Sequence, residues 1–206
     1  MIGVIDYGVG NVQAFLNLFK RLGLPGKRVS DVNELSRSTH LILPGVGHFD
    51  HSMALLNKSG LRSNLERLVM NDKVPVLGVC VGMQMLADTS DEGELPGLGW
   101  IPGRVHSMKN NLNCQDIRLP HMGWNNLSVN PESSLFSKNF DLHPEFYFLH
   151  SYCFEANVRE NVAATAEYGS TFDAVVSREN IHGVQCHPEK SHHWGEQLLK
   201  NFVELT

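Results

Sequence analysis

The stretch Lys73–Ala87, KVPVLGVCVGMQMLA, decides the predicted fold. Its near-continuous apolar run over 74–80 is typical of a strand in a parallel sheet that helices cover on both faces. A single residue separates Cys80 from Gly78 on one side and from Gly82 on the other. This is the G-x-nucleophile-x-G pattern of a tight turn from a strand into a helix, where bulky neighbours would clash.

A thiol at such a turn lies at a helix N-terminus, where the helix dipole lowers its pKa and free backbone N–H groups can hold developing negative charge. The alternative interpretation is a buried structural cysteine in a glycine-rich turn, and the pentapeptide alone gives the two interpretations about equal weight. Gln84 favours the reactive thiol. It returns to the same helix face one turn after Cys80, and it would otherwise place an amide among core residues.

A second candidate segment, GVQCHPEKS, spans residues 183–191. Pro188 biases His187 towards an extended backbone. In an extended chain the side chains of His187 and Glu189 point to the same side, and Cys186 points away. A carboxylate beside an imidazole orients a general base and stabilises its imidazolium. A surface pair at a strand end is the better interpretation of this segment in isolation, but a cysteine nucleophile elsewhere reverses that preference.

Strands and helices alternate in the first part of the sequence. Apolar runs at 2–6 and 40–44 precede glycine turns, and each is followed by apolar residues at helical spacing, as 74–80 is by 82–87. This order predicts an α/β fold with a parallel sheet between helices. Further strands, with a hairpin turn near 178–180 and a final helix after them, predict an antiparallel extension; these strands are expected at 145–155, 161–168 and 174–188. Without repeats or linkers, we expect a single domain over 1–206.

Two glycine turns after strands could each serve a ligand. In PGVGHF, residues 44–49, Gly45 and Gly47 permit backbone geometries that aim N–H groups at an oxyanion, although a plain turn is the alternative. The other turn, GVGN at 8–11, does not continue as G-x-G-x-x-G because position 13 is glutamine. We therefore expect no dinucleotide cofactor there.

Composition excludes several classes of function. The net charge is −5 and no block of Lys and Arg occurs, which disfavours nucleic-acid binding. The longest apolar stretch, about 74–87, is too short to cross a bilayer, and the N-terminal sequence lacks the basic region of a signal peptide. Four cysteines at 80, 114, 153 and 186 show no C-x-x-C spacing, so we expect reduced thiols in a cytoplasmic protein. The 11 histidines form no metal-ligand motif, and we expect no metal site.

Taken together, these motifs resemble the class I glutamine amidotransferases. Within that family the sequence is most similar to the glutaminase subunits of imidazole glycerol phosphate synthases, which act in histidine biosynthesis. The similarity runs nearly from end to end and implies a flavodoxin-like fold, a mixed and mostly parallel sheet between helices. It rests on the following segments: 4–11, 40–49, 78–84, 91–105, 120–125, 150–152 and 183–191.

The resemblance implies a role for each residue of the candidate site. Cys80 would attack the carboxamide carbon of L-glutamine as a thiolate. His187 would take the thiol proton and give one to the leaving ammonia, and Glu189 would orient His187. The backbone N–H groups of Val46 and Val81 would form the oxyanion hole.

The resemblance also implies a substrate pocket and a partner. Glutamine would be held by five residues, namely Gly47, Gln84, Glu92, Ser151 and Tyr152. The partner would be a (β/α)8 barrel cyclase that receives the ammonia in a heterodimer and makes imidazole glycerol phosphate and an aminoimidazole carboxamide ribotide. The docking face would include Asn11, Pro120, Met122 and Trp124.

Some positions depart from the family pattern, although none removes a proposed catalytic residue. Valine stands at 81 where leucine is common, cysteine at 186 where an aromatic residue is common, and the segments around Gln13 and His192 also diverge. The departures leave room for the first of three alternatives, and the other two are rival hypotheses in their own right. The chain could be a paralogous glutaminase that feeds a surface-polysaccharide sugar amidotransferase, a non-catalytic docking or regulatory subunit, or a cysteine hydrolase without a partner.

Overall fold

The strand predicted from the Lys73–Ala87 stretch lies in the middle of a mixed sheet. The structure is a computed structural model that describes residues 1–110, 117–141 and 143–205. Cys114, one of the four cysteines expected to be reduced, lies outside the described residues. Five strands run parallel in the order β2-β1-β3-β4-β13. They are β2 (Gly26–Val29), β1 (Ile2–Ile5), β3 (His40–Gly45), β4 (Val76–Cys80) and β13 (Ile181–Val184).

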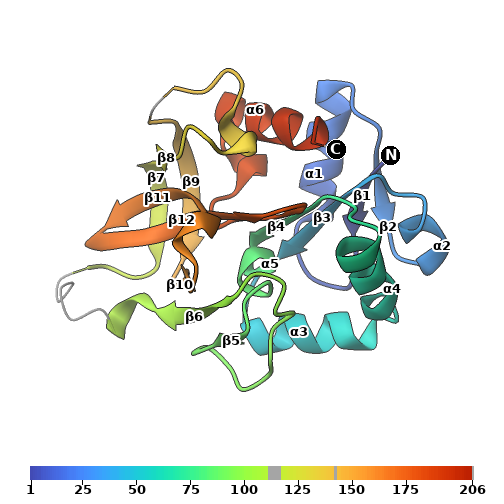
Figure 1. The fold of residues 1–206 in the computed structure, drawn as a ribbon, viewed down its shortest axis with the longest axis horizontal. Helices are drawn as coiled ribbons and strands as arrows, with labels where there is room; N and C mark the ends of the chain where they lie inside the picture. Colours follow the sequence, from blue (N-terminus) through green and yellow to red (C-terminus); the bar gives the residue numbers. More distant parts are fainter. Residues whose placement is uncertain (111–116, 142, 206) are drawn as a thin grey trace.

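Helices cover both faces of this parallel half, as the apolar strands require. Figure 1 shows α1 and α6 above the sheet, and α3, α4 and α5 below it. The α-helices are α1 (Val12–Leu22), α2 (Val32–Leu35), α3 (Phe49–Lys58), α4 (Arg62–Glu66), α5 (Val81–Gln84) and α6 (His192–Val203). A π-helical turn, Arg67–Asn71, extends α4, and short 3-10 turns occur at Met108–Asn110, Ser134–Phe136, Arg159–Asn161 and Pro188–Lys190.

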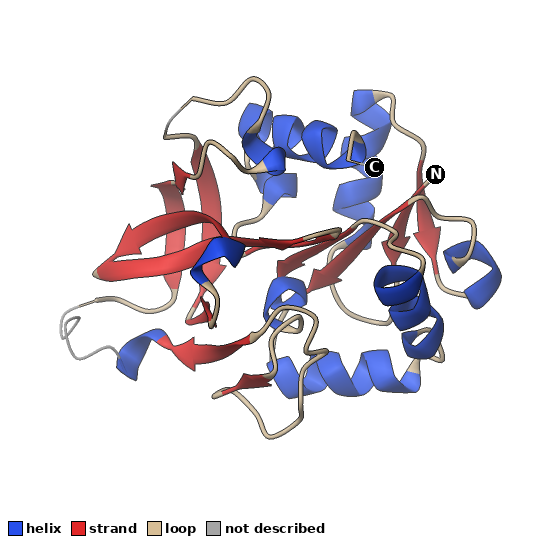
Figure 2. Cartoon of the chain, in the orientation of Figure 1, coloured by secondary structure: helices blue, strands red, loops and turns tan. Residues whose placement is uncertain are grey.

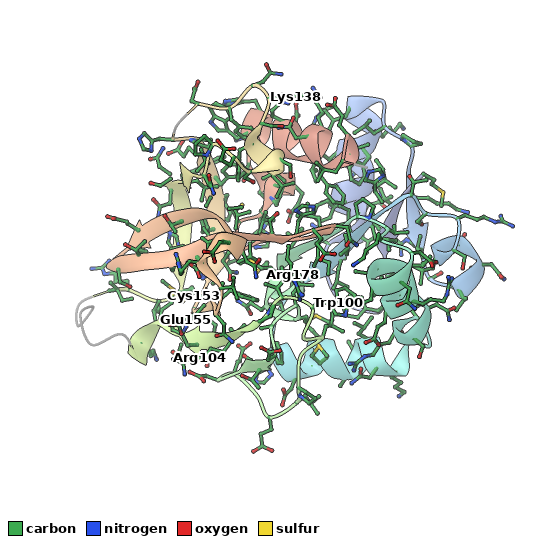
Figure 3. All side chains as sticks on the ribbon, in the orientation of Figure 1. Trp100, Arg104, Lys138, Cys153, Glu155 and Arg178 are labelled. Atoms are coloured by element: carbon green, nitrogen blue, oxygen red, sulfur yellow. The ribbon has the colours of Figure 1, made fainter. Side chains whose placement is uncertain are left out.

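The predicted antiparallel extension is confirmed beyond β13. The sheet continues through β12, β10, β6 and β5, while β11 pairs with β12 and β8 pairs with β11. Arg104 of β6 and Glu155 of β10 are register partners and form an ion pair of 3.0 Å; both are labelled in Figure 3. The strands are β12 (Ser170–Arg178), β10 (Tyr152–Ala156), β6 (Gly103–Ser107), β5 (Thr89–Ser90), β11 (Val162–Tyr168) and β8 (Ser128–Val129).

The single strand expected over 145–155 is wrong, because the chain changes sheets at Ser151. Residues before it form β9 (Glu145–His150), which pairs with β7 (His121–Asn126) in a separate two-stranded sheet. Residues after it form β10 in the main sheet, as Figure 2 shows in red. One chain cannot pair in both sheets without a break, and the carbonyl of Ser151 at the break accepts a hydrogen bond from the Met108 N–H.

Strand β2 had no signal in the sequence pattern. Its residues GKRV have only Val29 fully buried, so this edge strand lacks the apolar run that marked its neighbours. The final helix is confirmed as α6, with Leu198, Leu199 and Phe202 completely buried against the sheet. Within the described residues, no helix is long and apolar enough to cross a membrane.

Candidate active site

Cys80 occupies a strained turn between β4 and α5, as its flanking glycines predict. Its backbone angles are φ 56° and ψ −114°, a conformation that costs a non-glycine residue on the order of 1–3 kcal/mol. A Cβ atom on Gly82 would lie 1.9 Å from the carbonyl oxygen of Leu43, and one on Gly78 would lie 2.5 Å from the carbonyl oxygen of Gly82. Both positions therefore exclude side chains, and the turn projects the thiol toward a cavity at the carboxyl end of β4.

His187 and Glu189 form a buried pair beside this turn. His187 Nδ1 lies 2.9 Å from Glu189 Oε1, and their side chains are only 6% and 3% exposed. His187 has the extended backbone expected before proline, but the extended geometry assumed for Glu189 is wrong, because Pro188–Lys190 is a 3-10 turn. A carboxylate can only accept, so Nδ1 carries the proton that is donated to Glu189. The other ring nitrogen, Nε2, is left for proton exchange.

The electrostatics of His187 favour its protonated form. Burial lowers the pKa of His187, but interactions with the Cys80 thiol and the Glu189 carboxylate outweigh burial and raise the pKa to about 10. The imidazole therefore carries its proton at neutral pH, beside a cysteine sulfur. A thiolate and an imidazolium side by side form a nucleophile with its acid already in place.

A cavity of about 310 Å³ opens over Cys80. Its lining includes Cys80, His187 and every residue predicted for the oxyanion hole or for glutamine, and these are Val46, Gly47, Val81, Gln84, Glu92, Ser151 and Tyr152. Three further lining residues, Leu149, His150 and Lys190, were not predicted. A signal existed for two of them, since His150 directly precedes Ser151 and Lys190 directly follows Glu189. Pro120, which was predicted for the docking face, also reaches the cavity.

Two polar side chains of the cavity are fixed by hydrogen bonds. The Gln84 side chain, 2% exposed, donates through Nε2 to the carbonyl of Tyr152 at 3.1 Å and to Gln185 Oε1 at 3.0 Å. Its Oε1 atom is the end left for a ligand. Glu92 Oε2 accepts from the backbone N–H of Phe49 at 2.8 Å, at the first turn of α3. The cavity thus offers a carboxylate, which suits the amino group of an amino acid, and an amide oxygen, which can accept a hydrogen bond from a ligand N–H group.

The turn after β3 lies next to the nucleophile. Gly45 is the register partner of Cys80, and the following Val46 is 42% exposed at the rim. The carbonyl of Val46 accepts from Ser52 Oγ at 3.4 Å, and Gly47 has a φ of 82° that suits glycine. Val81 begins α5, where backbone N–H groups have no partner within the helix. The two backbone segments predicted for the oxyanion hole therefore flank Cys80.

The residues predicted for docking lie on two separate elements. Met122 and Trp124 are 61% and 42% exposed, and they alternate along β7 with the buried His121. Trp124 stacks on His192, with the ring centroids 5.1 Å apart. Asn11 instead caps α1, where its Oδ1 accepts from the Ala14 N–H at 3.1 Å. Its side chain thus has a structural role that the sequence did not indicate.

The remaining described cysteines are also free thiols, at positions 153 and 186, and both are buried. Burial raises the pKa of Cys186 well above its ordinary value, and the nearby Glu189 and Cys80 add to that rise. Among the described residues, no three His, Cys, Asp or Glu side chains are grouped so as to hold a metal ion.

Comparison with known proteins identifies the family of the chain. The chain belongs to the class-I glutamine amidotransferase family, which matches residues 3–205. It is 54% identical over 205 residues to the imidazole glycerol phosphate synthase subunit HisH of Bdellovibrio bacteriovorus, and 47% identical to the same subunit of Leptospira borgpetersenii, with 100% of each chain covered in both comparisons.

Solved structures confirm the fold. A crystal structure of a glutamine amidotransferase has a TM-score of 0.76 at 22% identity, covering 99% of this chain and 97% of that one. A glutamine amidotransferase from Thermotoga maritima has a TM-score of 0.66 at 14% identity, covering 98% and 82%. The predicted α/β fold of this family, with its mixed sheet between helices, is thereby confirmed.

Proposed function

We propose that this chain is the glutaminase subunit of an imidazole glycerol phosphate synthase and hydrolyses L-glutamine to glutamate and ammonia for histidine biosynthesis. The observation that carries the proposal is the meeting of Cys80, at a strained turn, with the His187–Glu189 pair at one cavity. Relatives that bear the name of this subunit reach 54% identity over the whole chain. The chain acts as one domain over 1–206.

The proposed reaction uses Cys80 as the nucleophile. Its thiolate attacks the carboxamide carbon of glutamine, and the N–H groups of Val46 and Val81 stabilise the oxyanion. His187 protonates the amino group of the tetrahedral intermediate as its C–N bond breaks, so ammonia departs and a γ-glutamyl thioester remains on Cys80. Water then attacks the thioester and gives a proton to His187, and glutamate departs as the thiolate is restored. Glu189 holds His187 through Nδ1 at 2.9 Å and stabilises the imidazolium.

The proposed substrate pose follows from the polar groups of the cavity. The carboxamide lies over Cys80, against Gly47 and Gln84. The amino-acid end reaches Glu92, whose carboxylate matches a substrate ammonium group, while Ser151 and Tyr152 offer backbone groups. Lys190, which also lines the cavity, supplies a positive charge for the substrate carboxylate. A cavity of about 310 Å³ is a suitable volume for one amino acid.

The proposed partner is a (β/α)8 barrel cyclase that receives the ammonia. Met122 and Trp124 present exposed apolar surface on β7, and Pro120 precedes that strand at the cavity. Large aromatic side chains with exposed surface are the usual anchors of protein interfaces. We also propose Asn11 for the docking face, as the family resemblance implies. The intact Cys80, His187 and Glu189 argue against a chain that only docks or regulates.

Glutamate release tests the proposal directly. Wild-type chain and the Cys80→Ala variant are each mixed with the barrel cyclase and its ribotide substrate, and glutamate is measured. We expect Cys80→Ala to lose at least about 1000-fold in rate, because the nucleophile is absent, while the two proteins still co-purify. Cys153→Ala serves as the matched control, since that thiol is buried away from the cavity. Wild-type turnover by Cys80→Ala would refute the assignment.

The pathway is tested separately from the chemistry. Expression of this chain in a strain that lacks its own synthase glutaminase is expected to restore growth without histidine. Failure to restore growth, together with full glutamine hydrolysis in vitro, would favour the paralogous role in surface-polysaccharide synthesis. Hydrolysis that no barrel protein accelerates would instead favour a hydrolase without a partner.

A further inference from the structure

Gln185 lies directly behind the candidate nucleophile but outside the cavity. Its side chain is completely buried, and its Nε2 atom is 3.8 Å from the sulfur of Cys80, a hydrogen-bond distance for a sulfur acceptor. Its backbone N–H donates to the carbonyl of Ala174 at 2.8 Å, which fixes the residue just after β13. Because Gln185 does not line the cavity, it has no direct route to a bound substrate.

Hydrogen-bond chemistry fixes which end of the Gln185 amide faces the sulfur. The carbonyl of Tyr152 can only accept, so the Gln84 atom 3.1 Å from it must be the amide nitrogen. That same nitrogen lies 3.0 Å from Gln185, and its second hydrogen requires an oxygen there. The oxygen of Gln185 therefore faces Gln84, and its N–H faces Cys80. The orientation of the Gln185 amide therefore follows from its hydrogen-bond partners, and the flipped amide would not satisfy them.

The hydrogen bonds that link Cys80, Gln185 and Gln84 continue through the carbonyl of Tyr152 to a buried histidine pair, His150 and His121. The carbonyl of Tyr152 also accepts from His150 Nδ1 at 2.8 Å, so His150 Nε2 is an acceptor in the neutral ring. His121 Nδ1 lies 2.9 Å from that nitrogen and donates to it. Asn125 Nδ2 then donates to His121 Nε2 at 3.3 Å and to the carbonyl of Glu167 at 2.8 Å. Backbone carbonyls thus anchor the network in two places.

Both histidines of the pair are neutral at physiological pH. Burial lowers the pKa of His150 to about 3, with smaller contributions from the nearby His121 and His187, and lowers the pKa of His121 to about 4. Each ring therefore has a single donor and a single acceptor, and the hydrogen bonds run in one direction. The network supports Gln84 and Gln185 without placing a charge near the sulfur.

We propose that Gln185 is a positioning residue that donates a hydrogen bond to the Cys80 thiolate and holds the sulfur in place for attack. The inference rests on the proposed role of Cys80 as the nucleophile. A donor directed at a charged form stabilises that form, so Gln185 favours thiolate over thiol. The other titratable groups near the sulfur are Tyr7, Cys186 and His187. Burial keeps Tyr7 and Cys186 neutral, so His187 is the charged neighbour.

The test replaces the amide with a side chain of similar shape and no donor. Gln185→Met is compared with wild type and with Gln197→Met, a matched control on α6, where the amide contacts Asn201. Alkylation of Cys80 by iodoacetamide is followed against pH in the full-length chain, and the adduct is counted on the Cys80 peptide by mass spectrometry. We expect the midpoint for Gln185→Met to rise by about 0.5–1 pH unit, and the control to match wild type.

Turnover with the barrel cyclase supplies the second readout. We expect kcat for glutamine hydrolysis to fall about tenfold in Gln185→Met and KM to change less, because Gln185 reaches the cavity only through its hydrogen bond with Gln84. An alkylation midpoint equal to that of wild type would overturn the proposal, as would a rise in KM at unchanged kcat. If Gln185→Met does not fold, Gln185→Asn withdraws the donor by one methylene and is expected to shift the midpoint in the same direction. Alkylation requires no glutamine, so this arm is independent of the proposed glutaminase activity.

Discussion

Two histidines of one cavity are in opposite protonation states. His187 and His150 are both buried and both line the space above Cys80. The pKa of His187 is raised to about 10, whereas that of His150 is lowered to about 3. Burial pushes both values down, so burial does not account for the difference. The neighbours do: His187 interacts with the Glu189 carboxylate and the Cys80 sulfur, and His150 contacts a carbonyl and a second neutral imidazole.

This difference divides the cavity into a charged side and a neutral side. The charged side, where the lining residue His187 is held from behind by Glu189, suits proton transfer to a departing amine. The neutral side, with His150 and the carbonyl of Tyr152, fixes amide groups in place by hydrogen bonds with a defined direction. A glutaminase needs both, because its substrate is a neutral amide whose leaving group must gain a proton. The following predictions test the division.

Removing the carboxylate should make His187 more like His150. In Glu189→Gln the pKa of His187 is expected to fall, because an anion that favours the imidazolium is gone while burial still opposes it. Glutamate release with the cyclase present should drop about 100-fold or more. The pKa can be followed by NMR titration of the ring. Glu66→Gln, at an exposed position at the end of α4 and outside the cavity lining, is the control. A His187 pKa that stays near 10 would show that the carboxylate does not produce the difference.

Stability should depend on pH in opposite directions for the two histidines. A histidine in the unfolded chain has a pKa near 6.5. Below that pH the unfolded chain therefore binds a proton at His150, whereas the buried ring in the folded protein stays neutral. Stability is then lost as the pH falls from about 6.5 toward 3, with a slope of up to about 1.4 kcal/mol per pH unit for this residue. For His187, folded protein holds a proton that the unfolded chain releases, so its contribution is lost as the pH rises from about 6.5 to 10.

Urea unfolding of variants separates the two contributions. We expect His150→Gln to reduce the loss of unfolding free energy between pH 6.5 and 5, and His187→Gln to reduce the loss between pH 7.5 and 9. His193→Gln, at an exposed position of α6, should leave both slopes as in wild type. If unfolding free energy changes with pH equally in wild type and His150→Gln, this histidine is not held neutral in the folded protein.

Substitution of Cys186 is expected to have the smallest effect on activity. It is buried beside the charged side of the cavity, and its raised pKa keeps it a neutral thiol. Cys186→Ala should leave kcat and KM within about threefold, and should cost about 1 kcal/mol of stability for the lost sulfur volume. Enzyme assays and thermal unfolding check both values. A loss of activity approaching that of Cys80→Ala would place Cys186 in the chemistry and contradict the assignment of a single reactive thiol.

Much of the parallel half of the fold was predictable, because its strands are buried on both faces. Apolar runs marked β1, β3 and β4, and the hairpin between β12 and β13 turns at Glu179 and Asn180, as expected. Edge strand β2 could not be found, since its exposed GKRV has no apolar pattern. The break at Ser151 was equally hidden, because FYFLHSYCF gives no local sign that its two ends pair in different sheets.

Residues of the candidate site could be predicted only where a short local motif identifies them. The glycines around Cys80 and the proline after His187 constrain their own backbone, so these residues could be singled out. Gln185 could not, because its contact with Cys80 joins positions 105 residues apart. His150 and Lys190 directly adjoin predicted site residues in the sequence, but the cavity that they line is closed by distant segments. Their protonation and orientation depend on neighbours that a sequence pattern does not bring together.

The glycine contacts described at the nucleophile have a mechanical consequence. A Cβ atom on Gly45 would lie 2.3 Å from the backbone nitrogen of Gly82, so β3 and α5 meet backbone against backbone. The two nearest atoms on the α5 side are the Gly82 nitrogen and the Val81 carbonyl carbon, which are backbone atoms and cannot change rotamer to absorb a small displacement. The turn after Gly45, which carries Val46 at the protein surface, is therefore coupled rigidly to the residues that hold Cys80. A displacement of that turn would therefore also displace the sulfur of Cys80.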